Sequence, residues 1–272
     1  MVKNAPKPRA LILTGYGINC DHETAFAFEQ AGAEARRVHV NDLIDGHDRL
    51  DRYQILVFPG GFSYGDDIAS GRVLANRVKT HLAEALSEFI ARGGLVLGIC
   101  NGFQVMVKYG LLGAPEGSGR EQKATLATND SSRYEDRWVH LRTANRHCVF
   151  TRGLDRLTLP VAHGEGKFFA DPSTLEGLEK AGCVALRYTD ADGTAARNRF
   201  PLNPNGSLND IAGVCDPAGR VFGLMPHPER HLHFTHHPEW TWTAARARRE
   251  GRSLPEEGDG MAIFRNAVTY FG

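Results

Sequence analysis

The amino-acid sequence predicts an α/β protein: a mostly parallel central sheet with helices on both faces and an antiparallel strand extension. In the first half, short apolar runs alternate with segments whose apolar residues recur at helical spacing. This alternation is typical of parallel strands joined by helices. In the second half, strand-like runs follow one another with turn residues between them, and this pattern predicts the antiparallel extension.

The elements of the first half follow from apolar spacing and from the glycines at their ends. Strands are expected at 9–14, 34–40, 54–58 and 95–99, and helices at 23–32, 72–92 and 102–109. The segment 72–92 is expected to be one amphipathic helix, because its apolar stripe contains Val73, Val78, Leu82, Leu86 and Phe89.

In the second half, strands are expected at 137–143, 157–161, 183–188 and 221–225, and a last helix at 261–271. Asp216-Pro-Ala-Gly219 separates the apolar runs 211–215 and 220–224, which predicts a hairpin. The chain has no internal repeat and no low-complexity linker. We therefore expect a single domain over residues 1–272, with a polar lead at 1–9 and a C-terminal tail and helix at 231–272.

The composition excludes several classes of function. Lys+Arg and Asp+Glu number 32 each, so no net field draws the chain to nucleic acid or to an acidic membrane. No apolar run approaches the roughly 18 residues of a membrane span, and the polar lead lacks the apolar stretch of a signal peptide. We therefore expect a cytoplasmic protein. The 5 cysteines are scattered without a Cys-x-x-Cys pair, which favours neither a disulfide framework nor a zinc site.

One cysteine stands where a predicted strand ends and a predicted helix begins, in Gly98-Ile-Cys-Asn-Gly102. This is a Gly-x-Cys-x-Gly form of the nucleophile elbow, a strained turn that lifts one side chain away from the backbone. Glycine is needed on both sides because a side chain there would collide with neighbouring backbone. The helix N-terminus beneath the sulfur favours negative charge. The pentapeptide alone also fits a buried cysteine in a tight turn.

A nucleophilic cysteine needs a base, and His227 follows a predicted strand between two prolines. Pro226 and Pro228 favour an extended segment, in which His227 and Glu229 point to the same side. Glu229 would then bind one ring nitrogen and leave the other to face Cys100. A nearby histidine cluster completes no metal-ligand set and is expected on a surface loop; its members are His231, His233, His236 and His237.

The developing oxyanion requires two backbone N–H groups. Asn101, directly after the cysteine, supplies one. The segment Gly60-Gly61-Phe62 ends a predicted strand and can supply the other, because glycine allows the chain to approach a ligand closely. An ordinary turn at this segment remains open on the sequence alone.

The extended elbow at 98–104 and the His-Pro-Glu segment resemble the triad-type (class I) glutamine amidotransferases. Four further motifs are similar to the glutaminase subunits of phosphoribosylformylglycinamidine synthase: 58–66 (FPGGFSYGD), 129–133 (NDSSR) with 137–139 (RWV), 163–168 (HGEGKF) and 203–207 (NPNGS). The resemblance runs from about Ala10 to Arg230 and weakens after that residue.

This resemblance implies a flavodoxin-like class I fold. It also implies that the protein hydrolyses glutamine to glutamate and ammonia in purine (IMP) biosynthesis. It implies that Cys100 is the nucleophile, His227 the general base and acid, and Glu229 the residue that orients His227. It implies an oxyanion hole at Gly61 and Asn101. Further positions match the substrate pocket: Gly60, Phe62, Gln104, His163, Gly164 and Glu165.

The resemblance also implies partners: a large synthetase subunit, PurL, which receives the ammonia, and a small bridging subunit, PurS. ATP and magnesium are expected on the synthetase, and no cofactor in this chain. In agreement with this expectation, Gly60-Gly61 lacks the Gly-Lys-[Ser/Thr] of a P-loop.

Other functions are compatible with parts of the pattern. A different class I amidotransferase or a γ-glutamyl hydrolase would use the same fold and the same residues. A non-catalytic binding module would not need the complete set of Cys100, His227 and Glu229. An oxidative-stress protein with a reactive elbow cysteine would not need the His-Pro-Glu segment.

Overall fold

The centre of the molecule is a mixed sheet, seen in a computed structural model that describes residues 6–116 and 121–272. Residues 1–5 of the polar lead lie outside this description. Within the described residues, the sheet has nine strands in the order β2-β1-β3-β4-β11-β10-β9-β6-β7, and β5 pairs with β8 separately. The strands are β1 Arg9–Thr14, β2 Glu34–His39, β3 Ile55–Phe58, β4 Leu95–Ile99, β5 Ala124–Ala127, β6 Glu135–Thr143, β7 Arg156–His163, β8 Lys167–Ala170, β9 Val184–Thr189, β10 Ile211–Cys215 and β11 Val221–Leu224.

The sheet is parallel from β2 to β11 and antiparallel from there to β7. Every residue of β3 and β4 is buried, as expected for parallel strands covered on both faces. The predicted hairpin is confirmed as the β10–β11 pair, joined through the turn at Asp216–Gly219. These pairings confirm the predicted fold class.

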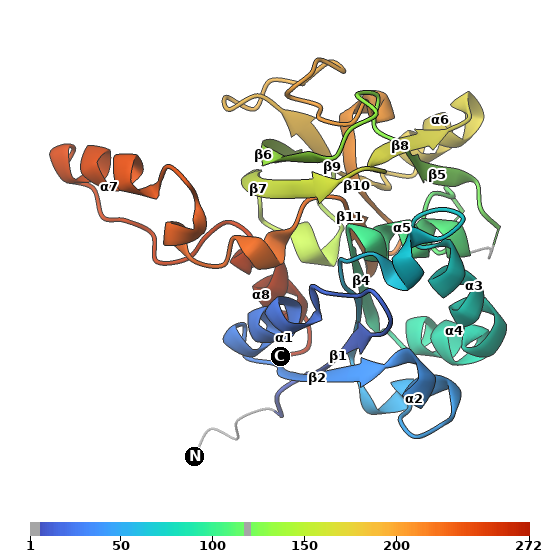
Figure 1. Cartoon of the computed structure of the whole chain (residues 1–272). Coiled ribbons are helices and arrows are strands. Elements are labelled where there is room, and N and C mark those ends of the chain that lie inside the picture. The colour runs from blue at the N-terminus through green and yellow to red at the C-terminus, as the bar shows by residue number, and fades with distance from the viewer. Residues whose placement is uncertain (1–5, 117–120) are drawn as a thin grey trace.

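Helices cover both faces of the parallel half (Figure 1). On one face α1 packs against α8, with the rings of Phe28 and Phe264 edge to face at 5.1 Å. On the other face α5 packs against β3 and β4, and α3 packs against α5 and α4. The helices are α1 Asp21–Gln30, α2 Val40–Ile44, α3 Arg72–His81, α4 Ala83–Ala91, α5 Asn101–Tyr109, α6 Pro172–Lys180, α7 Trp240–Arg249 and α8 Met261–Thr269.

Several predicted elements differ from the observed ones by one or two residues at an end, and two differences, at 72–92 and at 34–40, have a clear structural cause. The segment 72–92 is two helices, because Leu82 leaves the helical conformation (φ −122°, ψ 9°) while its side chain stays in the core and keeps the apolar stripe intact. The strand predicted at 34–40 ends at His39, whose ring accepts a hydrogen bond from Asn41 N and caps α2. The sequence reasoning also missed α2, α6, α7, β5 and β8.

The antiparallel half of the sheet curls, so that its last strand, β7, returns to the carboxyl ends of β4 and β11. His227, just after β11, donates its backbone N–H to Pro160 O of β7 at 2.8 Å. The carbonyl of Ala162 in β7 lies 3.6 Å from Cys100 Sγ, just after β4. Three strand ends therefore meet at one place.

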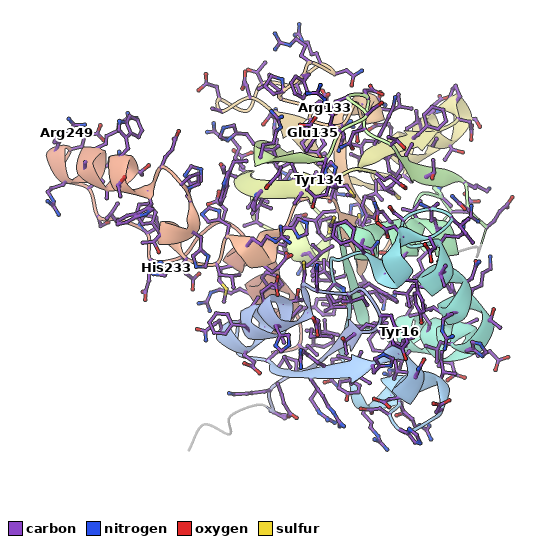
Figure 2. All side chains as sticks on the ribbon, viewed as in Figure 1. Tyr16, Arg133, Tyr134, Glu135, His233 and Arg249 are labelled. Carbon is purple, nitrogen blue, oxygen red and sulfur yellow. The ribbon has the colours of Figure 1, made fainter. Side chains whose placement is uncertain are left out.

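The tail predicted at 231–272 has two parts. Helix α7 stands away from the body, whereas α8 returns to the core (Figure 1). The bridge between His233 and Glu257 closes the base of this arm, which we define as residues 234–256. Figure 2 labels His233 at the base and Arg249 at the outer end. Among the described helices, none combines the length and the apolar character needed to cross a membrane.

Candidate active site

Cys100 occupies a strained turn between β4 and α5. Its backbone has φ 50° and ψ −106°, outside the conformations that a residue with a Cβ ordinarily adopts. Such strain costs about 1–3 kcal/mol and persists only where surrounding structure enforces it. Here Cys100 N donates to Leu224 O of β11 at 2.8 Å, and Cys100 O accepts from Gln104 N at 3.0 Å. The strand-turn-helix context of the predicted elbow is thus present.

The flanking glycines are required by space. A Cβ on Gly102 would lie 1.8 Å from Phe58 O, and one on Gly98 would lie 2.3 Å from Met106 Sδ and 2.9 Å from Gly102 O. Neither φ is in the left-handed region, so close packing alone excludes a side chain. As a result, the first turn of α5 lies directly against β3 and β4.

The candidate base and its orienting acid form a buried pair. The distance between His227 Nδ1 and Glu229 Oε1 is 2.6 Å, and neither side chain is more than 2% exposed. The prediction of a fully extended segment was wrong, because residues 228–230 form a 3-10 turn. Pro228 lacks an N–H and has a fixed φ, so it suits the first position of a helical turn. The turn still brings Glu229 onto the imidazole.

The electrostatics of the site favour a charged imidazole. Burial disfavours the imidazolium, yet the charges of Glu229 and then of Cys100 raise the pKa of His227 well above its ordinary value. Two buried polar atoms, His227 Nε2 and Glu229 Oε2, have no hydrogen-bond partner within the described residues. A buried polar atom without a partner is costly. Because Nε2 has no such partner among the residues described, it can exchange a proton with a reacting group that enters the site.

The backbone around the thiol offers donors for an oxyanion. In the described part of the chain, the N–H groups of Gly61 and Asn101 donate to no acceptor, whereas Phe62 N donates to Gly17 O at 2.8 Å. Gly61 has φ +143°, and a Cβ there would lie 2.7 Å from Gly17 O. Of the predicted segment 60–62, Phe62 N is therefore committed to Gly17, whereas the N–H of Gly61 is free among the residues that the structure describes.

His163 is part of a buried polar network below the site. Its Nδ1 lies 3.2 Å from Asn129 Oδ1, and its Nε2 lies 3.5 Å from Asn205 Nδ2. Burial, together with the charge of His227, lowers the pKa of His163 to about 3, so the ring is neutral at physiological pH. The predicted substrate-binding role of His163 is untested, and its ring is committed to the two asparagines. These asparagines come from motifs that carried the family resemblance.

Gln104 links the elbow helix to the turn between β7 and β8. Its Nε2 donates to Glu165 O at 2.6 Å, and its Oε1 accepts from Asn101 Nδ2 at 3.0 Å. Asn101 Oδ1 in turn accepts from Ser63 N at 3.2 Å. The predicted pocket residues Gln104 and Glu165 are therefore brought together with Asn101, while Gly164 O accepts from Asn129 N at 2.9 Å.

Aromatic rings border the site. The Phe62 and Tyr134 rings lie 6.4 Å apart and each is about half exposed. Burial and the charge of Cys100 raise the pKa of Tyr134. Figure 2 labels Tyr134 beside the start of β6. Sequence reasoning did not single out Tyr134, because an exposed aromatic residue in a loop carries no spacing signal.

The histidine cluster lies at the base of the arm, and among the described residues it is not part of a group close enough to hold a metal ion. His231 is buried, and its Nδ1 donates to Thr158 O at 2.7 Å. Its ring and that of His237 pack against Trp138, with centroids at 5.0 and 4.5 Å. The prediction of a surface loop therefore misplaces His231, whose apolar ring faces fill a gap beside β6.

The fold and the site define the class of this protein as a glutamine amidotransferase, because a cysteine elbow and a His-Glu pair meet at the end of a parallel sheet. Residues 7–271 match the family described as the CobB/CobQ-like glutamine amidotransferase domain. Among curated relatives, subunit PurQ of phosphoribosylformylglycinamidine synthase from Methanococcus maripaludis is 48% identical over 272 residues, covering 100% of this chain and 99% of the relative. PurQ from Dehalococcoides mccartyi is 48% identical over 265 residues, covering 97% and 98%.

A solved structure agrees with these matches. A chain of the PurLQS structure from Thermotoga maritima superimposes with a TM-score of 0.71 at 31% identity, covering 98% of this chain and 100% of that one. The chain belongs to the PurQ family of glutamine amidotransferases.

Proposed function

We propose that this chain is the glutaminase subunit of a phosphoribosylformylglycinamidine synthase and passes ammonia from glutamine to a synthetase subunit in purine (IMP) biosynthesis. The observation that supports it most is the buried His227–Glu229 pair at 2.6 Å beside the strained Cys100. Membership of the PurQ family supports the substrate and the pathway. We also propose that residues 1–272 form a single domain, since the family match spans 7–271.

The first half-reaction releases ammonia. The Cys100 sulfur attacks the carboxamide carbon of glutamine, and the carbonyl electrons move to an oxygen that accepts hydrogen bonds from Gly61 N and Asn101 N. When the tetrahedral intermediate collapses, the carbon–nitrogen bond breaks and His227 gives its proton to the leaving nitrogen. Ammonia departs and a thioester remains on Cys100.

The second half-reaction frees the enzyme. The neutral His227 takes a proton from water, and the resulting hydroxide adds to the thioester carbonyl. The carbon–sulfur bond then breaks, glutamate leaves, and the thiolate and imidazolium are restored. Glu229 holds Nδ1 through both halves, so that Nε2 always faces the reacting groups.

The proposed partners are a large synthetase subunit, PurL, and a small bridging subunit, PurS, with ATP and magnesium bound on the synthetase. The relatives are named as subunits, and the similar solved chain comes from a PurLQS structure. Ammonia must reach the synthetase unprotonated, because ammonium has no lone pair with which to attack. We therefore expect a sealed path between subunits and weak glutaminase activity in the isolated chain.

A glutamine-like diazo-ketone reagent tests the nucleophile. The reagent should alkylate Cys100, and peptide mass spectrometry should find a single adduct there. An adduct on Cys20, Cys148, Cys183 or Cys215 in place of Cys100 would contradict the assignment.

Substitution of the base tests the mechanism. His227→Ala should keep the fold and lose most of the glutaminase activity measured with the synthetase present, while His233→Ala at the base of the arm should behave as the unmodified protein. Equal turnover in the two variants would remove His227 from the mechanism. Glutamate release that no synthetase preparation stimulates would favour a stand-alone hydrolase.

A further inference from the structure

A second thiol lies beside the His227–Glu229 pair. Cys20 directly precedes α1, and its side chain is buried. Its Sγ, one ring nitrogen of His227 and one carboxylate oxygen of Glu229 all lie within 4.8 Å of one another. The proposed steps of glutamine hydrolysis do not use this sulfur, and the scattered cysteines of the sequence gave no sign that two of them share one site.

The sulfur is bound on two sides. Arg230 Nη2 donates to Cys20 Sγ at 3.2 Å, and the thiol donates to Asn19 Oδ1 at 3.3 Å. Burial opposes the charge of Arg230, but the interaction with Cys20 raises the pKa of this guanidinium. Arg230 is the last residue of the 228–230 turn and follows Glu229 directly. The contact therefore fixes the turn that carries the orienting acid.

The main chain holds the sulfur and the imidazole against the same glycine. Cys20 N donates to Gly60 O at 3.2 Å, and Cys20 O accepts from Thr24 N at 3.2 Å in the first turn of α1. A Cβ on Gly60 would lie 2.9 Å from His227 Cε1 and 3.1 Å from Cys20 Sγ. Ring and sulfur thus pack side by side over Gly60, in a space that leaves no room for a methyl group.

We propose that Cys20 and Arg230 form a positioning pair for the His227 imidazole during amide hydrolysis. A ring held by one hydrogen bond can still swing about its side-chain torsions. Cys20 restricts this motion from the α1 side, and Arg230 secures the turn from which Glu229 reaches Nδ1. A small misplacement of a catalytic group can cost on the order of a hundredfold in rate. This inference rests on the proposed glutaminase function and assigns Cys20 no bond to substrate.

The charge of His227 depends on every group around it, so a pH profile tests the pair. Burial lowers the pKa of His227, and the interactions with Glu229, Cys100 and Cys20 raise it. The groups facing it are Glu229 and Arg230 from its own turn, Cys20 from α1, Cys100 from the elbow, His163 from β7 and Tyr134 before β6. Loss of Cys20 removes one raising interaction, so the alkaline limb of activity should move to lower pH.

The experiment compares five variants of the full chain: Cys20→Ala, Cys20→Ser, Arg230→Met, the double variant Cys20→Ala/Arg230→Met, and Cys183→Ala as the control. Cys183 is also buried and directly precedes β9, away from the site. Each variant is assayed with glutamine in the presence of the synthetase subunit, as kcat, KM and pH profile. The rate of Cys100 alkylation by the diazo-ketone is measured in the chain alone, and near-UV circular dichroism checks the fold.

Cys20→Ala should lower kcat on the order of tenfold, with KM within about twofold and the alkaline limb at lower pH. Cys20→Ser should recover part of kcat, since a hydroxyl also accepts from the guanidinium. The double variant should be no worse than the poorer single variant, because both residues act through one contact. Cys183→Ala should match the unmodified protein.

Unchanged kcat and pH profile in Cys20→Ala, or fully additive effects in the double variant, would overturn the inference. If Cys20→Ala does not fold, the inference is tested with Cys20→Ser and Arg230→Met, which keep most of the side-chain volume. Their kcat and pH profile are then compared with those of the unmodified protein. An unmodified chain without glutaminase activity in the complex would instead contradict the proposed function.

Discussion

At Gly102 the first turn of α5 touches the carbonyl of Phe58, and this contact fixes how far Cys100 rises above the sheet. The sequence signalled both flanking glycines, since a Gly-x-Cys-x-Gly pattern at a strand-to-helix junction has a steric meaning. It did not indicate a role for Cys20, because a single cysteine before a helix gives no sign in the sequence of which distant residues lie beside it. Residue roles that depend on local backbone can be predicted from sequence, whereas those that depend on a distant neighbour cannot.

Gly102→Ala should destabilise the protein and abolish Cys100 alkylation. The new Cβ would lie 1.8 Å from a backbone oxygen, so β3 or α5 must shift. Overpacking of this kind typically costs about 1–3 kcal/mol and occasionally more. Urea denaturation measures the loss. Gly15→Ala is the matched control, because its Cβ would meet atoms no nearer than 3.5 Å. Equal stability in the two variants would contradict the packing argument.

His163 should make the fold sensitive to acid. Its pKa is about 3 in the folded protein, well below the value of about 6.5 in an unfolded chain. The unfolded state therefore binds the extra proton first, and the free energy of unfolding falls as pH drops below about 6.5, by up to about 1.4 kcal/mol per pH unit.

Urea denaturation of the unmodified protein and of His163→Asn between pH 4.5 and 7.5 measures this slope. Asn has no titrating group, so the variant should show a shallower loss of stability on acidification. Parallel slopes would exclude His163 as the source.

At the scale of elements, the parallel core was predictable because β3 and β4 are continuous apolar runs, the first followed by Pro59-Gly60-Gly61 and the second preceded by Gly93-Gly94. The break at Leu82 was not predictable. Leu82 continues the apolar stripe, and only its backbone angles are non-helical. The short strands β5 and β8 were missed for another reason. They pair only with each other, and residues 124–127 and 167–170 are too short for a period to be read. The 228–230 turn shows the same limit, because proline is compatible with both an extended segment and a first helical position.

Gln104 joins two of these elements, and its removal should weaken substrate binding. Gln104→Leu leaves the partly buried carbonyl of Glu165 without its donor, at a cost of about 1–3 kcal/mol. The turn after β7 should loosen, and KM for glutamine should rise on the order of tenfold. Gln122→Leu is a matched control, since Gln122 Nε2 also donates to a backbone carbonyl, that of Ala124 at 3.0 Å. Equal KM values would show that the link does not shape the pocket.

At the scale of the whole molecule, the arm is separable from the body. His233 and Glu257 pair at its base, and Phe234 N donates to Glu256 O at 3.1 Å. Beyond that base, the His237 ring of the arm packs against Trp138 and lies 5.9 Å from the His231 ring, and His236 Nδ1 accepts from Leu232 N at 3.3 Å. In contrast, Phe264 of α8 is fully buried against α1. The sequence reasoning expected a tail and a terminal helix within 231–272, but it did not predict that the arm would stand away from the body while α8 enters the core.

Replacement of residues 234–256 by Asn-Gly, a two-residue hairpin turn, should leave the melting temperature within about 4 °C of the original, the shift expected from roughly 1 kcal/mol. Cys100 alkylation should be unchanged. Truncation after Gly260, which removes α8, should unfold the protein. A large loss of stability in the arm deletion, measured by differential scanning calorimetry, would show that the arm supports the core.

The hydrogen bond from Cys100 N to Leu224 O joins the strand ends that carry thiol and imidazole. The strands β4 and β11 are neighbours in the sheet. Any bending or twisting of the sheet therefore moves the thiol and the imidazole together. As a result, thermal motion of the rest of the protein changes the distance between the Cys100 thiol and the His227 imidazole only little. Surface helices can therefore shift, and their sequences can change, without altering the relative positions of Cys100 and His227.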